Sequence, residues 1–201
     1  MIDGDSTLAE VCFRVSEALG SRGISCVLTG GSAASLYAPQ TYMSRDADFI
    51  LAADDALDDV AKAVATLGFQ RDGKSRIFAH PNSPFTLDFP KGPLAVGGDY
   101  VHETHTLERD GMRLRILTPY DCVRDRLAHF YFWNDYTALD AAVGVAGRRA
   151  HEIDADALRA WTERESPALL EKFAEFERRL ATKSSKRPAD SLLAEWGKRA
   201  P

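Results

Sequence analysis

The spacing of hydrophobic residues predicts a helix at the start of the chain and a buried strand after it. Apolar residues recur every three or four positions on one face of this helix: Leu8, Val11, Cys12, Val15, Ala18 and Leu19. Ser6 or Thr7 supplies a side-chain cap for its first turn. The short apolar run over 24–29 is typical of a strand, which ends at the glycine pair that follows.

Further strands and helices alternate up to residue 118. Ser32 is expected to cap a short helix over 33–37, and a helix that begins at Asp54 or Asp55 is expected to end at Gly68. A loop is expected over 92–98. The Asp110–Gly111 pair is a strong turn signal and predicts a hairpin. The expected strands cover residues 46–51, 69–71, 77–80, 85–89, 104–107 and 114–117.

The character of the chain changes at Thr118 and Pro119, which suit the N-cap and first position of a helix. From there to about residue 180 the pattern is helical throughout. The sequence therefore predicts an α/β (or α+β) fold, with a small mixed sheet flanked by helices and then a C-terminal helical bundle. The expected parts are an α/β core over 1–118, a helical subdomain over 119–182 and a polar, mobile tail over 183–201.

Composition narrows the classes of function. The 201 residues have a formal net charge of −5, so the chain lacks the overall basic field of a nucleic-acid-binding protein. Contact with RNA would need a local patch, although solvated helix faces and a solubilising tail explain the same residues: Arg148, Arg149, Arg178, Arg179 and the stretch 183–187. Three widely spaced cysteines and the lack of a signal peptide predict reduced thiols in the cytoplasm. No stretch approaches the roughly 18 apolar residues of a membrane span.

A glycine pair at the end of the first strand suits phosphate binding. Gly30 and Gly31 lack a Cβ atom, so the backbone can approach a phosphate closely. Amide groups at a helix start favour an anion, and Ser32 adds a hydroxyl donor. A tight turn without a ligand would use the same residues, so this segment alone does not define a site.

Three aspartates follow in the next strands. Asp46 and Asp48 share one face of a predicted strand, and Asp88 interrupts an apolar strand. Each acid could simply face solvent. If the strand order gathers them, they repel one another by several kcal/mol at an effective dielectric of about 20, and Arg45 could neutralise one but hardly all three. Such a cluster needs a divalent cation, and carboxylates are ligands that Mg²⁺ accepts.

The order of these segments resembles the nucleotidyltransferase superfamily: a strand, Gly-Gly-Ser and a helix, then Asp-x-Asp, and a third Asp in a later strand. The chain looks most similar to the small bacterial nucleotidyltransferases and the abortive-infection-type toxins. The resemblance covers about residues 24–90. It extends more loosely to the helical part, where residues 118–119 and 125–128 are similar to an uncharacterised bacterial branch.

The resemblance implies an active site with two Mg²⁺ ions. Asp46 and Asp48 would bind the ions, and Asp88 would bind the catalytic ion and orient or deprotonate an acceptor hydroxyl. A nucleoside monophosphate would pass from a nucleoside triphosphate to that acceptor, with pyrophosphate released. The acceptor could be a protein, an RNA 3′ end or a small molecule.

The resemblance also implies a set of nucleotide-binding residues. Gly30, Gly31 and Ser32 would bind the β- and γ-phosphates, with Arg45 and Arg126 as further contacts. Arg126 stands near the position where the toxins have a lysine, and Arg is not equivalent to Lys as a point charge. The alternative is therefore a catalytically silent binding protein or a toxin–antitoxin-type partner. A partner protein or a homodimer fits both hypotheses.

Two further clusters have structural explanations beside functional ones. His102 and His105 lack the spacing of a helical zinc motif. An aromatic cluster in the helical part could stack on a nucleobase or on RNA, or it could form a helix core with a partly exposed cap. Its members are Phe130, Tyr131, Phe132, Trp133 and Tyr136.

Overall fold

A mixed sheet is the central element of the computed structural model, which describes residues 2–52 and 57–185. The strands are β1 (Cys26–Thr29), β2 (Asp46–Leu51), β3 (Ile77–Phe78), β4 (Thr86–Asp88), β5 (Ala95–Val96), β6 (Asp99–Tyr100), β7 (Thr104–Arg109) and β8 (Met112–Leu117). Six of them form one sheet in the order β3-β4-β2-β1-β8-β7, and β5 pairs with β6. β1 is antiparallel to β2 and parallel to β8, and β2 is parallel to β4.

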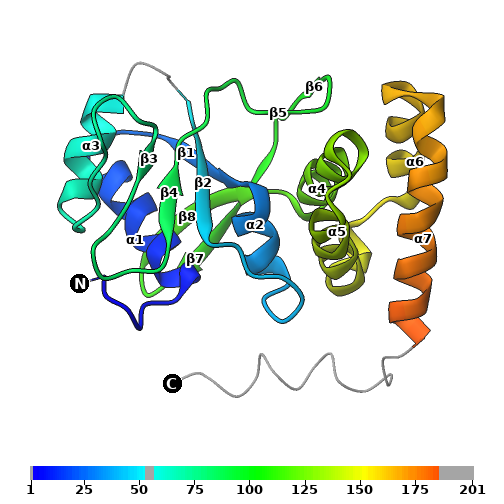
Figure 1. Cartoon of the computed structure of the whole chain (residues 1–201), viewed down its shortest axis with the longest axis horizontal. Coiled ribbons are helices and arrows are strands. Elements are labelled where there is room, and N and C mark those ends of the chain that lie inside the picture. Colours follow the sequence, from blue (N-terminus) through cyan, green and yellow to red (C-terminus); the bar gives the residue numbers. More distant parts are fainter. Residues whose placement is uncertain (1, 53–56, 186–201) are drawn as a thin grey trace.

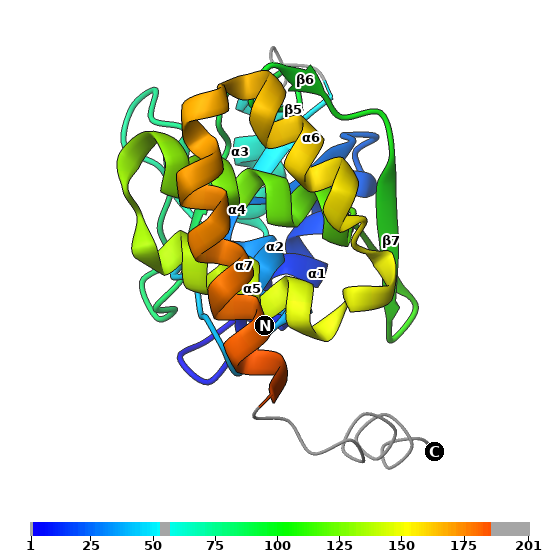
Figure 2. The same ribbon diagram turned by 90° about the vertical axis from the view of Figure 1, so that its right-hand side faces the viewer.

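Helices flank the sheet and form the C-terminal part (Figure 1). They are α1 (Leu8–Gly20), α2 (Gly30–Tyr37), α3 (Leu57–Ala65), α4 (Pro119–Trp133), α5 (Tyr136–Arg148), α6 (Ala155–Glu165) and α7 (Leu170–Ser185), with short 3₁₀ turns at Ala150–Glu152 and Pro167–Leu169. α1 and α3 lie on the side away from the C-terminal helices, and α2 lies between the sheet and α4 and α5. α6 and α7 form the outer layer (Figure 2). No helix in the described ranges is long and apolar enough to cross a membrane.

One hydrophobic core cluster extends from the sheet into the helical part. On the sheet, the Phe89 ring packs 5.8 Å from Phe49 and 5.4 Å from Phe78, measured between ring centroids. Among the helices, Tyr131 stacks on Trp161 with centroids 6.0 Å apart. Because apolar burial is continuous, the helices have a defined position relative to the strands that carry the candidate site.

Local signals predicted several elements correctly. The capping box at the start of α1 is formed by Thr7 and Glu10, each of which accepts a hydrogen bond from the other's backbone amide. Asp110 and Gly111 have φ angles of 51° and 77° at the turn of the β7–β8 hairpin. Thr118 caps α4, with its hydroxyl accepting from the amide three residues later. The α/β fold class and the helical C-terminal part are confirmed.

Other boundaries differ from the prediction. Helix α2 begins at Gly30, so Ser32 lies inside its first turn instead of capping it. Residues 69–71 form an isolated bridge from Gln70 to Ala79 instead of a strand. The predicted loop over 92–98 contains β5, because its backbone pairs with β6. Helix α7 continues to Ser185, three residues beyond the expected end of the helical subdomain; the rest of the predicted tail and the helix start at 54–55 lie outside the described residues.

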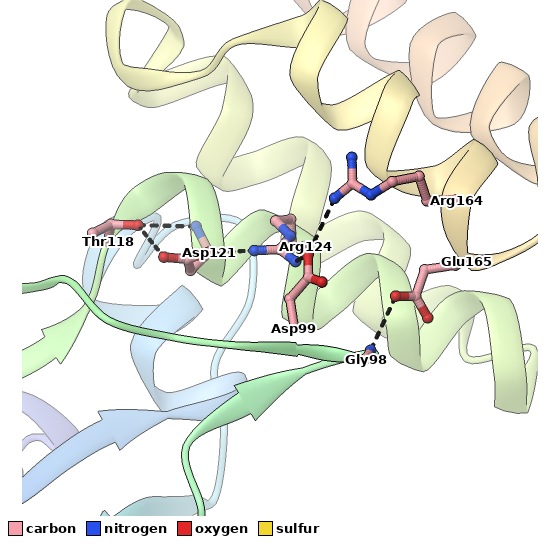
Figure 3. Close-up of polar contacts among 7 residues, drawn as sticks. All are labelled: Gly98, Asp99, Thr118, Asp121, Arg124, Arg164 and Glu165. Carbon is pink, nitrogen blue, oxygen red and sulfur yellow. Dashed lines mark hydrogen bonds and ion pairs between the residues drawn. The ribbon is translucent and has the colours of Figure 1, made fainter.

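The β5–β6 hairpin is joined to the helical part by polar contacts (Figure 3). Asp99 accepts from the Arg124 guanidinium on α4 at 2.6 Å and from Arg164 on α6 at 3.2 Å. The Gly98 amide donates to the Glu165 carboxylate at 3.0 Å. The hairpin directly follows β4 along the chain, so this clasp connects the segment after β4 to α4 and α6.

Asp99→Asn should lower the free energy of unfolding by about 1–3 kcal/mol. The change leaves the buried Arg124 guanidinium with Asp121, 2.9 Å away, as its carboxylate partner. The matched control is Glu108→Gln, because Glu108 and Arg113 form an ion pair that is exposed on both sides, and such pairs contribute about 1 kcal/mol or less. Urea denaturation measures both variants. Equal losses would show that the clasp does not stabilise the fold.

Candidate active site

The turn between β1 and α2 places a glycine against an aspartate. Thr29 pairs with Asp48 across β1 and β2, and Gly30 follows Thr29 directly. Gly30 has a φ of +64°, and a Cβ atom on it would lie 2.2 Å from Oδ2 of Asp48. Gly31 is also closely covered, because a Cβ there would lie 2.9 Å from the Tyr42 hydroxyl. The glycine pair therefore permits close packing at this turn.

Ser32 joins the same turn to β2. It is fully buried, and its hydroxyl donates to the Thr29 carbonyl at 2.8 Å and accepts from the Asp48 amide at 3.1 Å. The hydroxyl proton is therefore used within the turn. In this structure Ser32 connects β1, α2 and β2 and so holds the Asp48 backbone in place.

Strands β2 and β4 place three carboxylates on one face. Asp48 pairs with Asp88 in the parallel register, and Asp46 pairs with Thr86. These four positions alternate with buried apolar ones, which are Ala47, Phe49 and Leu87. Thr86 donates a short hydrogen bond from its hydroxyl to the Asp46 carboxylate. The acids predicted from widely separated segments are thus neighbours because two strands pair in register.

A buried arginine from α4 faces this group of acids. Arg126 is 6% exposed, and its Nε and one terminal nitrogen both donate to Oδ2 of Asp125, at 2.9 and 2.7 Å. Its charge also acts on Asp48, whose pKa it lowers. A buried guanidinium needs nearby carboxylates, and here they come from its own helix and from the sheet.

Two of the three acids, Asp48 and Asp88, lie in an environment that opposes their ionisation. The pKa of Asp48 is raised to about 7, mainly by burial; the charges of Asp88 and Asp46 contribute to the rise, and Arg126 offsets part of it. Burial is also the main reason that the pKa of Asp88 is raised, with Asp46 adding to it. Such a pair of perturbed acids is common in functional sites.

The three carboxylates are of the chemical type that binds a divalent cation, but their side chains are not positioned around a common point. Carboxylate oxygens are suitable Mg²⁺ ligands, and a cation would remove the repulsion that raises the pKa of Asp48. Among residues 2–52 and 57–185, no three acidic, histidine or cysteine side chains are close enough to enclose an ion. Asp46 accepts from Thr86 through Oδ1, so an ion would bind through the other carboxylate oxygen or replace this hydrogen bond.

The structure brings together most, but not all, of the sequence-predicted site. The glycine pair, Ser32, the three aspartates and Arg126 gather around the β1–α2 turn. Arg45 is exposed at the start of β2, and its backbone carbonyl accepts from the Thr86 amide at 3.0 Å. Thr86, Tyr42 and Asp125 also contact the predicted residues and were not indicated by the sequence. The alternation of β4 could have identified Thr86, because it lies two residues before Asp88.

Other candidate clusters are used within the fold. His105 lies 3.8 Å from the Glu152 carboxylate. Arg179 donates to Asp140 at 2.7 Å and to Glu175 at 2.7 Å. The three cysteines are free and buried, and burial raises the pKa of each thiol: Cys12, Cys26 and Cys122.

Comparison with known proteins identifies the fold. No protein-family model and no curated protein sequence matches the chain. An antigenic nucleotidyltransferase-like protein from Paracoccidioides brasiliensis is similar in structure, with a TM-score of 0.56, 13% identity, and coverage of 84% of this chain and 93% of that one. ANT(2'')-Ia in complex with adenylyl-2''-tobramycin is similar with a TM-score of 0.54, 14% identity, and coverage of 84% and 99%. The chain has a nucleotidyltransferase fold.

Proposed function

We propose that the protein is a Mg²⁺-dependent nucleotidyltransferase, which moves a nucleoside monophosphate from a nucleoside triphosphate to a hydroxyl acceptor. The observation that carries the proposal is the placement of Asp46, Asp48 and Asp88 on one face of two paired strands, with Gly30 at the Asp48 carboxylate. The fold supports it, because similar structures include a nucleotidyltransferase-like protein and a protein bound to an adenylylated product.

The proposal assigns each site residue a role that suits its position. Asp46, Asp48 and Asp88 would hold Mg²⁺, which when bound supplies charge neutralisation for the transferred phosphoryl group. Asp88 would also orient or deprotonate the acceptor hydroxyl, since its raised pKa suits proton transfer. The first amides of α2 and the exposed Arg45 would contact the β- and γ-phosphates.

A second candidate is a nucleotidyltransferase fold that binds a ligand or a partner without turnover. The engaged hydroxyl of Ser32 favours it, because this proton is donated to the Thr29 carbonyl and is one donor fewer for phosphates. Arg126 favours it as well, since both of its bonds go to Asp125. A toxin–antitoxin-type role, with a protein or homodimer partner, belongs to either candidate.

Calorimetric titration, followed by an assay of pyrophosphate release, distinguishes the two candidate functions. Each of the four nucleoside triphosphates is added, with Mg²⁺ or with EDTA, to the wild type and to the Asp46→Ala/Asp48→Ala variant. Mg²⁺-dependent binding that disappears in the variant is the expected result. No binding of any triphosphate by a protein that circular dichroism shows to be folded would contradict the proposal. Binding without pyrophosphate release, for a protein hydroxyl, an RNA 3′ end or a small polyol as acceptor, would favour the second candidate.

A further inference from the structure

A stripe of three residues on α4 extends from the candidate site to an exposed aromatic ring. Arg126, His129 and Trp133 are spaced i, i+3 and i+7, so they share one side of the helix. Seven residues advance about 10 Å along a helix axis. At one end of the stripe the Arg126 charge acts on Asp48, and at the other end Trp133 is 69% exposed. The stripe therefore begins at the site and ends on an uncovered indole.

Trp133 is exposed although its backbone is firmly held. It is the last residue of α4, and the next residue, Asn134, ends the helix in the left-handed region with a φ of 54°. Lys172 on α7 donates to the Tyr131 carbonyl at 2.6 Å and to the Asn134 side-chain oxygen at 2.7 Å. The His129 ring packs against the indole with centroids 5.0 Å apart. A planar ligand would thus meet a preorganised aromatic surface.

Charges of both signs lie near the stripe, with Arg126 and Lys172 as the cations, and the exposed ring of Trp133 suits a nucleobase as its ligand. Burial and Arg126 lower the pKa of His129, which favours the neutral form of its ring. The carboxylates that act on His129 are those of Asp125 and Asp135. Carboxylates repel a phosphate, but they accept hydrogen bonds from the amino groups of bases. A base is also flat, uncharged and suited to stacking on an aromatic ring.

We propose that the base of the nucleoside triphosphate stacks on Trp133, with His129 supporting the ring, while the phosphates remain at the aspartates and the start of α2. The proposal rests on the proposed function, because that function places the phosphates at one end of the stripe. It assigns to α4 the recognition of the nucleoside and makes Trp133 a binding residue rather than an exposed cap of the helical core.

Titration with two ligands tests the proposal. Calorimetry on the full chain with Mg²⁺ compares ATP with inorganic triphosphate, which has the phosphates and no base. Trp133→Ala should weaken ATP binding about 5- to 150-fold, the range that stacking on one aromatic ring provides, and should leave inorganic triphosphate unchanged. Trp133→Phe should restore most of the ATP affinity. The matched control is Tyr100→Ala, since Tyr100 is 64% exposed and lies on β6.

The outcomes separate this inference from the function on which it rests. Unchanged ATP affinity in Trp133→Ala, in a protein whose wild type binds ATP with Mg²⁺, overturns the stacking proposal and leaves the proposed function standing. Equal weakening of ATP and inorganic triphosphate also overturns it, because Trp133 would then act on the phosphate site. If the wild type binds neither ligand, both the proposed function and the stacking proposal are wrong.

Discussion

Asp48→Asn should reduce nucleotidyl transfer by about 10³-fold or more at saturating Mg²⁺. The Asp48 carboxylate lies against Gly30 and beside Asp88, and an amide of the same shape would remove its charge without opening a cavity. The measurement is pyrophosphate release from the triphosphate that the wild type uses. Asp72→Asn is the control, because Asp72 is exposed in the turn before β3 and should leave the rate unchanged.

The same variant should be more stable than the wild type in EDTA at pH 8. The pKa of Asp48 is about 7 in the folded protein, above its ordinary value of 3.8, so the folded state binds the proton more tightly than the unfolded state does. The resulting loss of stability is absent below about pH 4, grows as the pH rises to 7, and is complete above it. Asparagine does not ionise, so the gain should approach about 1–3 kcal/mol above pH 7 and vanish near pH 4.

Urea denaturation at pH 4.5 and pH 8 measures this gain. Lost activity together with raised stability would show that the Asp48 carboxylate is required for nucleotidyl transfer and lowers the stability of the folded protein. Lost activity together with lowered stability at pH 8 would instead give Asp48 a structural role. The Asp72→Asn control should be within about 0.5 kcal/mol of the wild type at both pH values.

The elements that could be predicted from the sequence are those whose cause is local. Thr7 with Glu10, and Asp110 with Gly111, each fix a helix start or a turn within four residues of chain. Strand β2 was predicted with its observed bounds: polar and apolar residues alternate from Asp46 to Phe49, and two more apolar residues complete the strand. The β5–β6 hairpin was missed, since its two-residue strands depend on contacts that Asp99 makes with α4 and α6.

The sequence predicts the acidic residues of the candidate site, but it does not predict the residues that contact them. Residue type and spacing along the chain are enough to identify Asp46, Asp48 and Asp88, without knowledge of the strand order. The partners depend on register and on packing between distant segments: Thr86 meets Asp46 because β2 and β4 are parallel, and Asp125 becomes a site neighbour through Arg126. How each donor is used is set by the same tertiary contacts, which is why the hydroxyl of Ser32 points to a carbonyl.

Substitutions at Gly30 separate the steric requirement of the turn from the effect of the Asp48 charge. Gly30→Ala should lower the free energy of unfolding by about 2–4 kcal/mol, because it adds a left-handed alanine and an atom 2.2 Å from the Asp48 carboxylate. Gly23→Ala is the matched control: Gly23 has a φ of +72° and nothing within 4 Å of the added atom. Gly23→Ala should therefore lower the free energy of unfolding only by the cost of a left-handed alanine, about 1–2 kcal/mol.

A double substitution then identifies the atom responsible. Asp48→Ala removes the two closest contacts of the added methyl group, at 2.2 and 2.8 Å, and leaves the one to Cβ at 3.1 Å. In the Asp48→Ala background, Gly30→Ala should therefore cost no more stability than Gly23→Ala does, as urea denaturation would measure. Triphosphate binding with Mg²⁺ should stay absent in the double variant, because relief of the clash does not return the carboxylate. An undiminished cost of Gly30→Ala in that background would show that the backbone of the turn, and not Asp48, requires glycine.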